Sequence, residues 1–117
     1  MDRLFRASIN SWNGLRAAAR SEAAFRQELA VLALAVPLAF LVTEGAWKRL
    51  GLVGIIAFLL VVELLNTSIE KLADRVSLDH EPQIGRVKDM GSAAVGVALV
   101  MAGSVWLLAA AERLGLF

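Results

Sequence analysis

Three long apolar stretches, almost free of charged residues, alternate with shorter polar segments along the chain. They comprise Leu29–Thr43, Leu50–Ile69 and Met90–Ala111. Glu63 is the one charged residue inside them. An α-helix rises about 1.5 Å per residue, so about 20 apolar residues cross a hydrocarbon layer of about 30 Å. The pattern predicts an all-α membrane protein with transmembrane helices at about residues 29–47, 50–72 and 90–112.

The segment before the first stretch, residues 2–27, combines arginines with apolar residues that are mostly three or four positions apart. The apolar positions are Leu4, Phe5, Ile9, Trp12, Leu15 and Phe25. This spacing predicts an amphipathic helix that lies on the membrane surface. The alternative is an ordinary polar lead-in with scattered apolar residues. A secretory signal peptide is not expected, because the first apolar stretch begins too far from the amino terminus.

Basic residues are distributed unequally between the segments that flank the apolar stretches. Nine Lys or Arg residues lie before the first stretch or between the second and the third, whereas three lie on the opposite side. Cytoplasmic segments of membrane proteins are enriched in Lys and Arg. We therefore expect the amino terminus and residues 70–89 in the cytoplasm and the carboxyl terminus on the other side of the membrane.

The composition agrees with a membrane protein and excludes several other classes. Apolar residues make up 58% of the chain and the mean hydropathy is +0.66, whereas soluble domains are about half apolar. The absence of cysteine excludes a disulfide scaffold, a thiol nucleophile and an iron–sulfur site. A net charge of +1 gives no electrostatic support for a nucleic-acid partner.

Small residues recur at helical spacing in the predicted transmembrane helices. Ala94, Ala98 and Ala102 are four positions apart in the third, and Ala35 and Ala39 have the same spacing in the first. Small side chains allow helices in membranes to approach closely, so we expect tight packing within the chain or between copies. Three helices are few for enclosing a polar site, which favours self-association.

Polar residues that are unusual for a membrane helix gather at the end of the second stretch. Glu63, Asn66, Glu70 and Asp74 share one face of a helix. A charged side chain inside a bilayer costs roughly 2.5–3.5 kcal/mol, so this face requires cations, a metal ion or water. The alternative is that Glu63 only fixes helix packing and that Glu70 and Asp74 belong to a solvated helix end.

The polar segment before the third stretch offers further candidate groups. Lys88 and Asp89 directly precede the stretch, although Asp89 is also favourable simply as a negative charge in the first turn of a helix. His80, the only histidine, is interpreted as a residue of a surface loop. The chain contains no G-x-x-x-x-G-K-[ST] or G-x-G-x-x-G motif, so a nucleotide would not be held by those phosphate-binding loops.

Five motifs run in order along nearly the whole chain. They are S-W-N-G-L-R-A-A (Ser11–Ala18), E-A-A-F-R-Q-E (Glu22–Glu28), V-E-L-L-N-T-S-I-E (Val62–Glu70), A-D-R (Ala73–Arg75) and G-R-V-K-D-M-G-S-A-A-V (Gly85–Val95). Together they closely resemble the prokaryotic diacylglycerol kinase family. The resemblance implies a homotrimer in the bacterial inner membrane, with active sites shared between subunits at the cytoplasmic face. It also implies transfer of the γ-phosphate of magnesium ATP to diacylglycerol, which gives phosphatidate.

The resemblance assigns expected roles to individual residues. Glu63 matches the catalytic base and Asn66 an active-site asparagine. The matches to Mg²⁺ ligands that dock the ATP phosphates are Glu22 and Glu70. Other nucleotide-binding positions fall on Arg3, Asn10, Glu81, Lys88 and Asp89. Positions near the lipid fall on Arg16, Glu28 and Ser92. Asn10 departs from the family, in which close relatives often carry tyrosine, so aromatic packing on the nucleotide is in doubt there.

Three alternatives to a diacylglycerol kinase remain open at this point. An undecaprenol kinase belongs to a related branch of the same family and phosphorylates a long polyprenol. A small proton-coupled transporter subunit has a similar length and a membrane-buried glutamate, but four spans would be expected. A non-catalytic membrane scaffold is the third, and it predicts that Glu63 can be replaced without loss of function.

Overall fold

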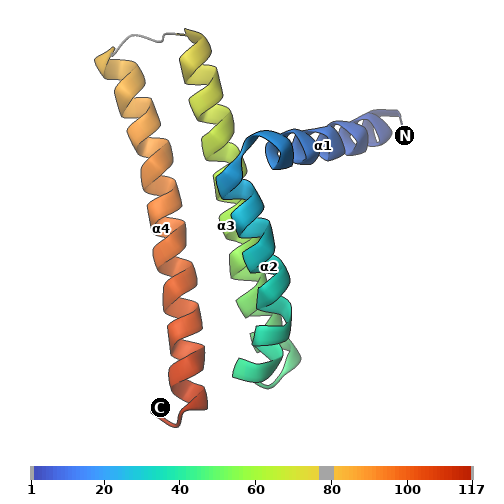
Figure 1. Cartoon of the computed structure of the whole chain (residues 1–117), viewed down its shortest axis with the longest axis vertical. Helices are drawn as coiled ribbons and strands as arrows, with labels where there is room; N and C mark the ends of the chain where they lie inside the picture. Colours follow the sequence, from blue (N-terminus) through green and yellow to red (C-terminus); the bar gives the residue numbers. More distant parts are fainter. Residues whose placement is uncertain (1, 77–80, 117) are drawn as a thin grey trace.

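The computed structural model describes residues 2–76 and 81–116, and these form four α-helices joined by short connections. The helices are α1 (Asp2–Ser21), α2 (Ala23–Val42), α3 (Ala46–Val76) and α4 (Pro82–Arg113). Helix α3 packs against both α2 and α4, whereas α2 and α4 have few direct contacts. Figure 1 shows α1 projecting sideways from the beginning of α2. The prediction of an all-α chain is confirmed for the described residues.

The helix predicted over residues 2–27 is shorter in the structure. Helix α1 ends at Ser21, and Glu22 has an extended backbone (φ −116°, ψ 110°) before α2 begins. The Arg26 guanidinium donates hydrogen bonds to the carbonyl oxygens of Ala19 (2.9 Å) and Arg20 (3.2 Å). The last carbonyls of a helix have no partners within it, so this side chain stabilises the break between the two helices.

The remaining helix ends also differ from the predicted spans. Helix α2 ends at Val42, before the predicted residue 47, because the chain turns at Gly45 with φ +96°. Helices α3 and α4 are longer than the spans predicted at 50–72 and 90–112. Both continue past the apolar stretches into polar sequence, to Val76 at the end of α3 and from Pro82 at the start of α4. His80 lies outside the described residues.

Small residues lie where the helices meet, as the sequence pattern indicates. Ala35 of α2, Ile56 of α3 and Ala102 of α4 form one buried cluster, against which Trp106 packs. Ala39 and Ala98 are buried as well. Ala94, which was expected to belong to the same ridge, is exposed in the single chain.

A set of polar contacts closes the end of the bundle that carries the α2–α3 turn. Lys48 pairs with Glu112 (2.7 Å between Nζ and Oε1), and Arg113 pairs with Glu44 (3.8 Å). The Trp106 indole donates a hydrogen bond to the Leu52 carbonyl oxygen at 3.1 Å. These contacts join the turn to the carboxyl-terminal end of α4, opposite the end at which α3 ends and α4 begins.

Three of the helices are long and apolar enough to cross a membrane: α2, α3 and α4. Their outer faces expose large apolar side chains, such as Leu41 (69% exposed) and Leu107 (73% exposed). Burial of apolar surface is the dominant favourable term in folding and association, so these faces require lipid or another protein surface. The prediction of three helices of membrane-spanning length is confirmed, and the chain is a membrane protein.

Gly45 is expected to be intolerant of a side chain. Its φ of +96° costs a non-glycine residue about 1–2 kcal/mol, so Gly45→Ala should lower the free energy of unfolding in detergent by about that amount. Gly54→Ala is the control, since Gly54 lies inside α3 with no atom near its added Cβ and alanine is the better helix former. Equal stability of the two variants would contradict the prediction.

Candidate active site

The polar residues of α3 differ in how deeply they are buried. Glu63 is half-buried, Asn66 is 8% exposed and Glu70 is exposed. The residues are three and four positions apart, so one side of α3 carries all of them. Asn66 lies against Gly91 of α4, so the buried part of this side faces α4.

Asn66 links the α3–α4 contact to Glu70. Its Nδ2 donates a hydrogen bond to Glu70 Oε1 at 3.1 Å. Its Oδ1 is buried and has no hydrogen-bond partner among the described residues. That oxygen lies against the backbone of Gly91 on α4. The amide is therefore held between a neighbouring helix and a carboxylate.

The α1–α2 junction and helix α2 each contribute one further carboxylate to the same region. Glu22, at the junction of α1 and α2, is half-buried and forms an ion pair with Lys71 (3.6 Å between Oε2 and Nζ). The negative charges of Glu22 and Glu70 both act on Glu63, and Glu63 in turn acts on Glu28. Glu28 Oε2 is buried without a hydrogen-bond partner among the described residues. Glu63 is repelled by each of the other three carboxylates, and a nearby cation would relieve that repulsion.

Magnesium is one cation that these carboxylates could bind. In the part of the chain that the structure describes, no three His, Asp or Glu side chains are close enough to hold a metal ion by themselves. Mg²⁺ is commonly bound by one or two carboxylates together with water and substrate phosphates. Glu22 lies at the α1–α2 junction and Glu70 on α3, and both carry the oxygen donors that Mg²⁺ prefers, so their chemistry suits an ion that also binds substrate phosphates.

Two of the residues predicted from the sequence form an ion pair with each other and, among the described residues, form no hydrogen bond or ion pair with these carboxylates. Asp74, the last member of the acidic face, pairs with Lys88 of α4. Lys88 is half-buried, whereas Asp89 and Ser92 are exposed on α4. Glu81 is exposed at the residue before α4. The expected acidic face therefore ends at Glu70 in this structure.

The residues expected on the first helix remain apart from the carboxylates. Arg3, Asn10 and Arg16 are exposed on α1, which packs mainly against α2. Within the described residues, none of the three forms a hydrogen bond or ion pair with Glu22, Glu28, Glu63 or Glu70.

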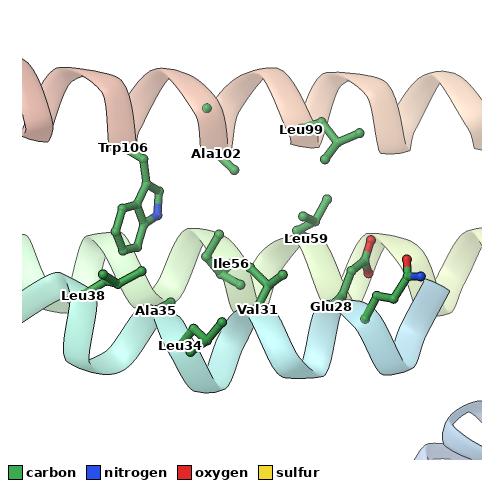
Figure 2. A pocket seen from close by; sticks show the side chains of 12 residues that line it. Glu28, Val31, Leu34, Ala35, Leu38, Ile56, Leu59, Leu99, Ala102 and Trp106 are labelled. Atoms are coloured by element: carbon green, nitrogen blue, oxygen red, sulfur yellow. The ribbon is translucent and has the colours of Figure 1, made fainter. Parts of the chain in front are cut away.

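An open apolar groove of about 560 Å³ lies between α2 and α4, with α3 as its floor (Figure 2). Glu28 points into one end of the groove, and Trp106 lies toward the other. The remaining lining is almost entirely apolar, for example Leu34, Leu59 and Leu99. The groove exists because α2 and α4 have few direct contacts. Sequence reasoning missed it, since its lining is distributed over all three apolar stretches.

The arrangement places the Glu28 carboxylate at the end of an apolar groove, which suits a molecule with a long apolar part and a polar head. The family model described as "Prokaryotic diacylglycerol kinase" matches residues 9–110. The chain is 42% identical over 106 residues to the diacylglycerol kinase of Escherichia coli (strain K12), covering 91% of this chain and 87% of that protein. It is 41% identical over 106 residues to the diacylglycerol kinase of Pseudomonas aeruginosa (strain PAO1), covering 91% and 86%. The corresponding protein of Haemophilus influenzae is 33% identical over 103 residues, covering 88% and 87%. This chain belongs to the prokaryotic diacylglycerol kinase family.

Proposed function

We propose that the protein transfers the γ-phosphate of magnesium ATP to the hydroxyl group of diacylglycerol and thereby forms phosphatidate. The observation that carries the proposal is the position of Glu28 and Glu63. One carboxylate points into the end of an apolar groove, and the other is within electrostatic range of it. An acyl chain along the groove would bring the lipid hydroxyl to these two groups. Membership of the family supports the same substrate.

Glu63 is the proposed general base. A hydroxyl proton moves to the Glu63 carboxylate while the hydroxyl oxygen bonds to the γ-phosphorus and the bond from that phosphorus to the β-phosphate bridging oxygen breaks, releasing ADP. Phosphoryl transfer depends mainly on in-line positioning and charge stabilisation, and proton acceptance by a positioned carboxylate adds to both. Asn66 supports the site by donating its hydrogen bond to Glu70.

Glu22 and Glu70 are the proposed ligands of the magnesium ion, and the ion's chemistry here is neutralisation of the phosphate charge. Lys88 is the proposed phosphate-binding cation on α4. It pairs with Asp74 in this structure, so nucleotide binding would replace one anionic partner with another. Glu81 and Asp89, both exposed, are proposed as further contacts of the nucleotide.

A homotrimer is proposed as the functional assembly. The exposed apolar faces of the single chain and the exposed Ala94 support contacts between copies. Neighbouring copies could also supply Arg3, Asn10 and Arg16 from α1 and Ser92 from α4, which the single chain leaves away from the groove lining. Asn10 offers an amide rather than a ring to the nucleotide.

The proposed location is the bacterial cytoplasmic membrane. Lys71 contacts the α1–α2 junction through Ser21 (3.2 Å) and Glu22, which places the two basic segments at the same end of the molecule. The enrichment of Lys and Arg in cytoplasmic segments supports a cytoplasmic amino terminus and a periplasmic carboxyl terminus. Helix α1, with exposed Leu4, Phe5 and Trp12, would lie on the inner surface of the membrane.

Purified protein in mixed micelles with radiolabelled magnesium ATP tests the proposed activity. Labelled phosphatidate is expected from diacylglycerol, and much less product is expected from undecaprenol under the same conditions. Preferential labelling of the polyprenol would overturn the substrate assignment. No labelling of either alcohol would overturn the kinase proposal.

Filling the groove is expected to weaken lipid binding selectively. Gly103 lines the groove and has no atom within 4 Å of an added Cβ, so Gly103→Leu should occupy groove volume without disturbing the helices. We expect the KM for diacylglycerol to rise about tenfold, an effect of about 1.4 kcal/mol, while the KM for magnesium ATP stays within twofold.

The control for this variant is Gly51→Leu. Gly51 is also free of close neighbours at its Cβ, but it lies at the end of the bundle with the α2–α3 turn. Kinetics close to those of the unmodified protein are expected. An unchanged KM for diacylglycerol in Gly103→Leu would exclude the groove as the acyl-chain site.

A further inference from the structure

Gly91 marks a close contact between α3 and α4 beside the candidate site. It is buried, although both of its sequence neighbours on α4 are exposed. A Cβ added at Gly91 would overlap Asn66 Oδ1 and would lie 3.4 Å from Asn66 Cγ. The other glycines of α4 behave differently, because an added Cβ at Gly85, Gly96 or Gly103 meets nothing within 4 Å.

The overlap falls on an amide whose two ends have different surroundings. Asn66 Oδ1 is buried against Gly91 without a hydrogen-bond partner among the described residues, while Nδ2 donates to Glu70 Oε1. Leaving a buried acceptor unpaired is costly. Turning the amide over would be worse for Glu70, because the amide oxygen would then face a carboxylate oxygen. The observed orientation therefore serves the contact with Glu70.

The amide group is planar and rigid, so its oxygen and nitrogen move together. A methyl group at position 91 would push Oδ1 away from α4 and would shift Nδ2 relative to Glu70. The hydrogen bond to a carboxylate is charge-assisted and depends on geometry. The bare backbone of Gly91 thus sets the direction from which Asn66 holds Glu70.

We propose that Gly91 is a positioning residue of the kinase: its missing side chain fixes Asn66 so that the Asn66 amide orients Glu70 toward the magnesium–nucleotide complex. This inference rests on the proposed function, because it requires that Glu70 binds the magnesium ion. It goes further in naming a residue that touches neither substrate nor ion and acts through two others.

Kinetics of Gly91→Ala provide the first test. We expect the magnesium concentration for half-maximal rate to rise about tenfold, the effect of losing one hydrogen bond to a charged group, while the KM for diacylglycerol stays within twofold. Gly85→Ala, on the same helix but with open space at its Cβ, should match the unmodified protein. A purely structural role would instead reduce activity without a selective change in the magnesium requirement, and that result would overturn the proposal.

A double-mutant cycle on thermal unfolding in detergent provides a second test that needs no activity. Gly91→Ala should lower the unfolding temperature in the otherwise unmodified protein. In the Asn66→Ala background the same change should have little effect, because the oxygen that the methyl group meets is gone. If Gly91→Ala alone does not fold, the double variant should fold. Additive effects, or a double variant that also fails to fold, would overturn the proposal.

The two proposals fail in distinguishable ways. Unmodified protein that phosphorylates neither diacylglycerol nor undecaprenol overturns the proposed function. Active unmodified protein with additive unfolding effects, or with an unchanged magnesium requirement in Gly91→Ala, overturns the positioning role of Gly91 alone.

Discussion

Replacement of Glu63 by glutamine is expected to lower kcat by about 10²–10⁴-fold, the contribution typical of a general base. Glutamine preserves the size of the side chain and its capacity to hydrogen-bond the lipid hydroxyl, but it cannot accept the proton. The KM for magnesium ATP should change by less than about threefold, since the proposed ion ligands remain in place. Radiometric phosphorylation of diacylglycerol in mixed micelles measures both parameters.

Glu112→Gln is the matched control for this substitution. Glu112 is a glutamate at the opposite end of the bundle, where it pairs with Lys48 in an exposed position, and such surface pairs contribute little to stability. This control should retain the kcat of the unmodified protein. Comparable turnover in Glu63→Gln and Glu112→Gln would remove Glu63 from the role of base and would favour the non-catalytic interpretation of the acidic face.

Glu70→Gln is expected to raise the magnesium requirement by about 10–100-fold, a loss that is typical even of groups one step removed from a metal ion. The amide oxygen of glutamine can still accept the Asn66 hydrogen bond that Glu70 Oε1 accepts now, so the change removes charge and leaves the local contact. Rates measured over a magnesium titration at fixed ATP give the requirement directly.

The control for Glu70 is Glu44→Gln. Glu44 forms a long ion pair with Arg113 and its side chain is 85% exposed at the far end of the bundle. Its replacement should leave the magnesium titration unchanged. If Glu70→Gln behaved in the same way, Glu70 would not be an ion ligand, and the positioning role inferred for Gly91 would lose its target.

The three membrane-spanning helices could be predicted from the sequence, because a long apolar stretch almost free of charged residues forms a helix in a membrane. The break between α1 and α2 could not be predicted in this way, since the residue at the break is glutamate and not glycine or proline. It depends instead on Arg26, which donates to the last carbonyls of α1, and on Phe25, which packs against Ala18 of the preceding helix. The helix propensities of the individual residues give no information on such contacts between two helices.

The candidate site was predictable along α3 and not across helices. Helical spacing correctly places Glu63, Asn66 and Glu70 on one side of α3. It gives no information on the rotation of α4, which decides that Lys88 pairs with Asp74 and that Gly91 covers Asn66. The exposed positions of Arg3 and Arg16 on α1 likewise depend on packing and on other copies of the chain.

The groove between α2 and α4 is open along its side, and the helices that border it are long and apolar enough to span the membrane. A lipid can therefore enter by lateral diffusion in the leaflet, with its tail remaining in a hydrocarbon environment throughout. Encounter then takes place in two dimensions, so saturation depends on the mole fraction of the alcohol among the surrounding lipids. Inert phospholipid added to the same vesicles acts as a diluent, even when the total amount of substrate per millilitre is constant.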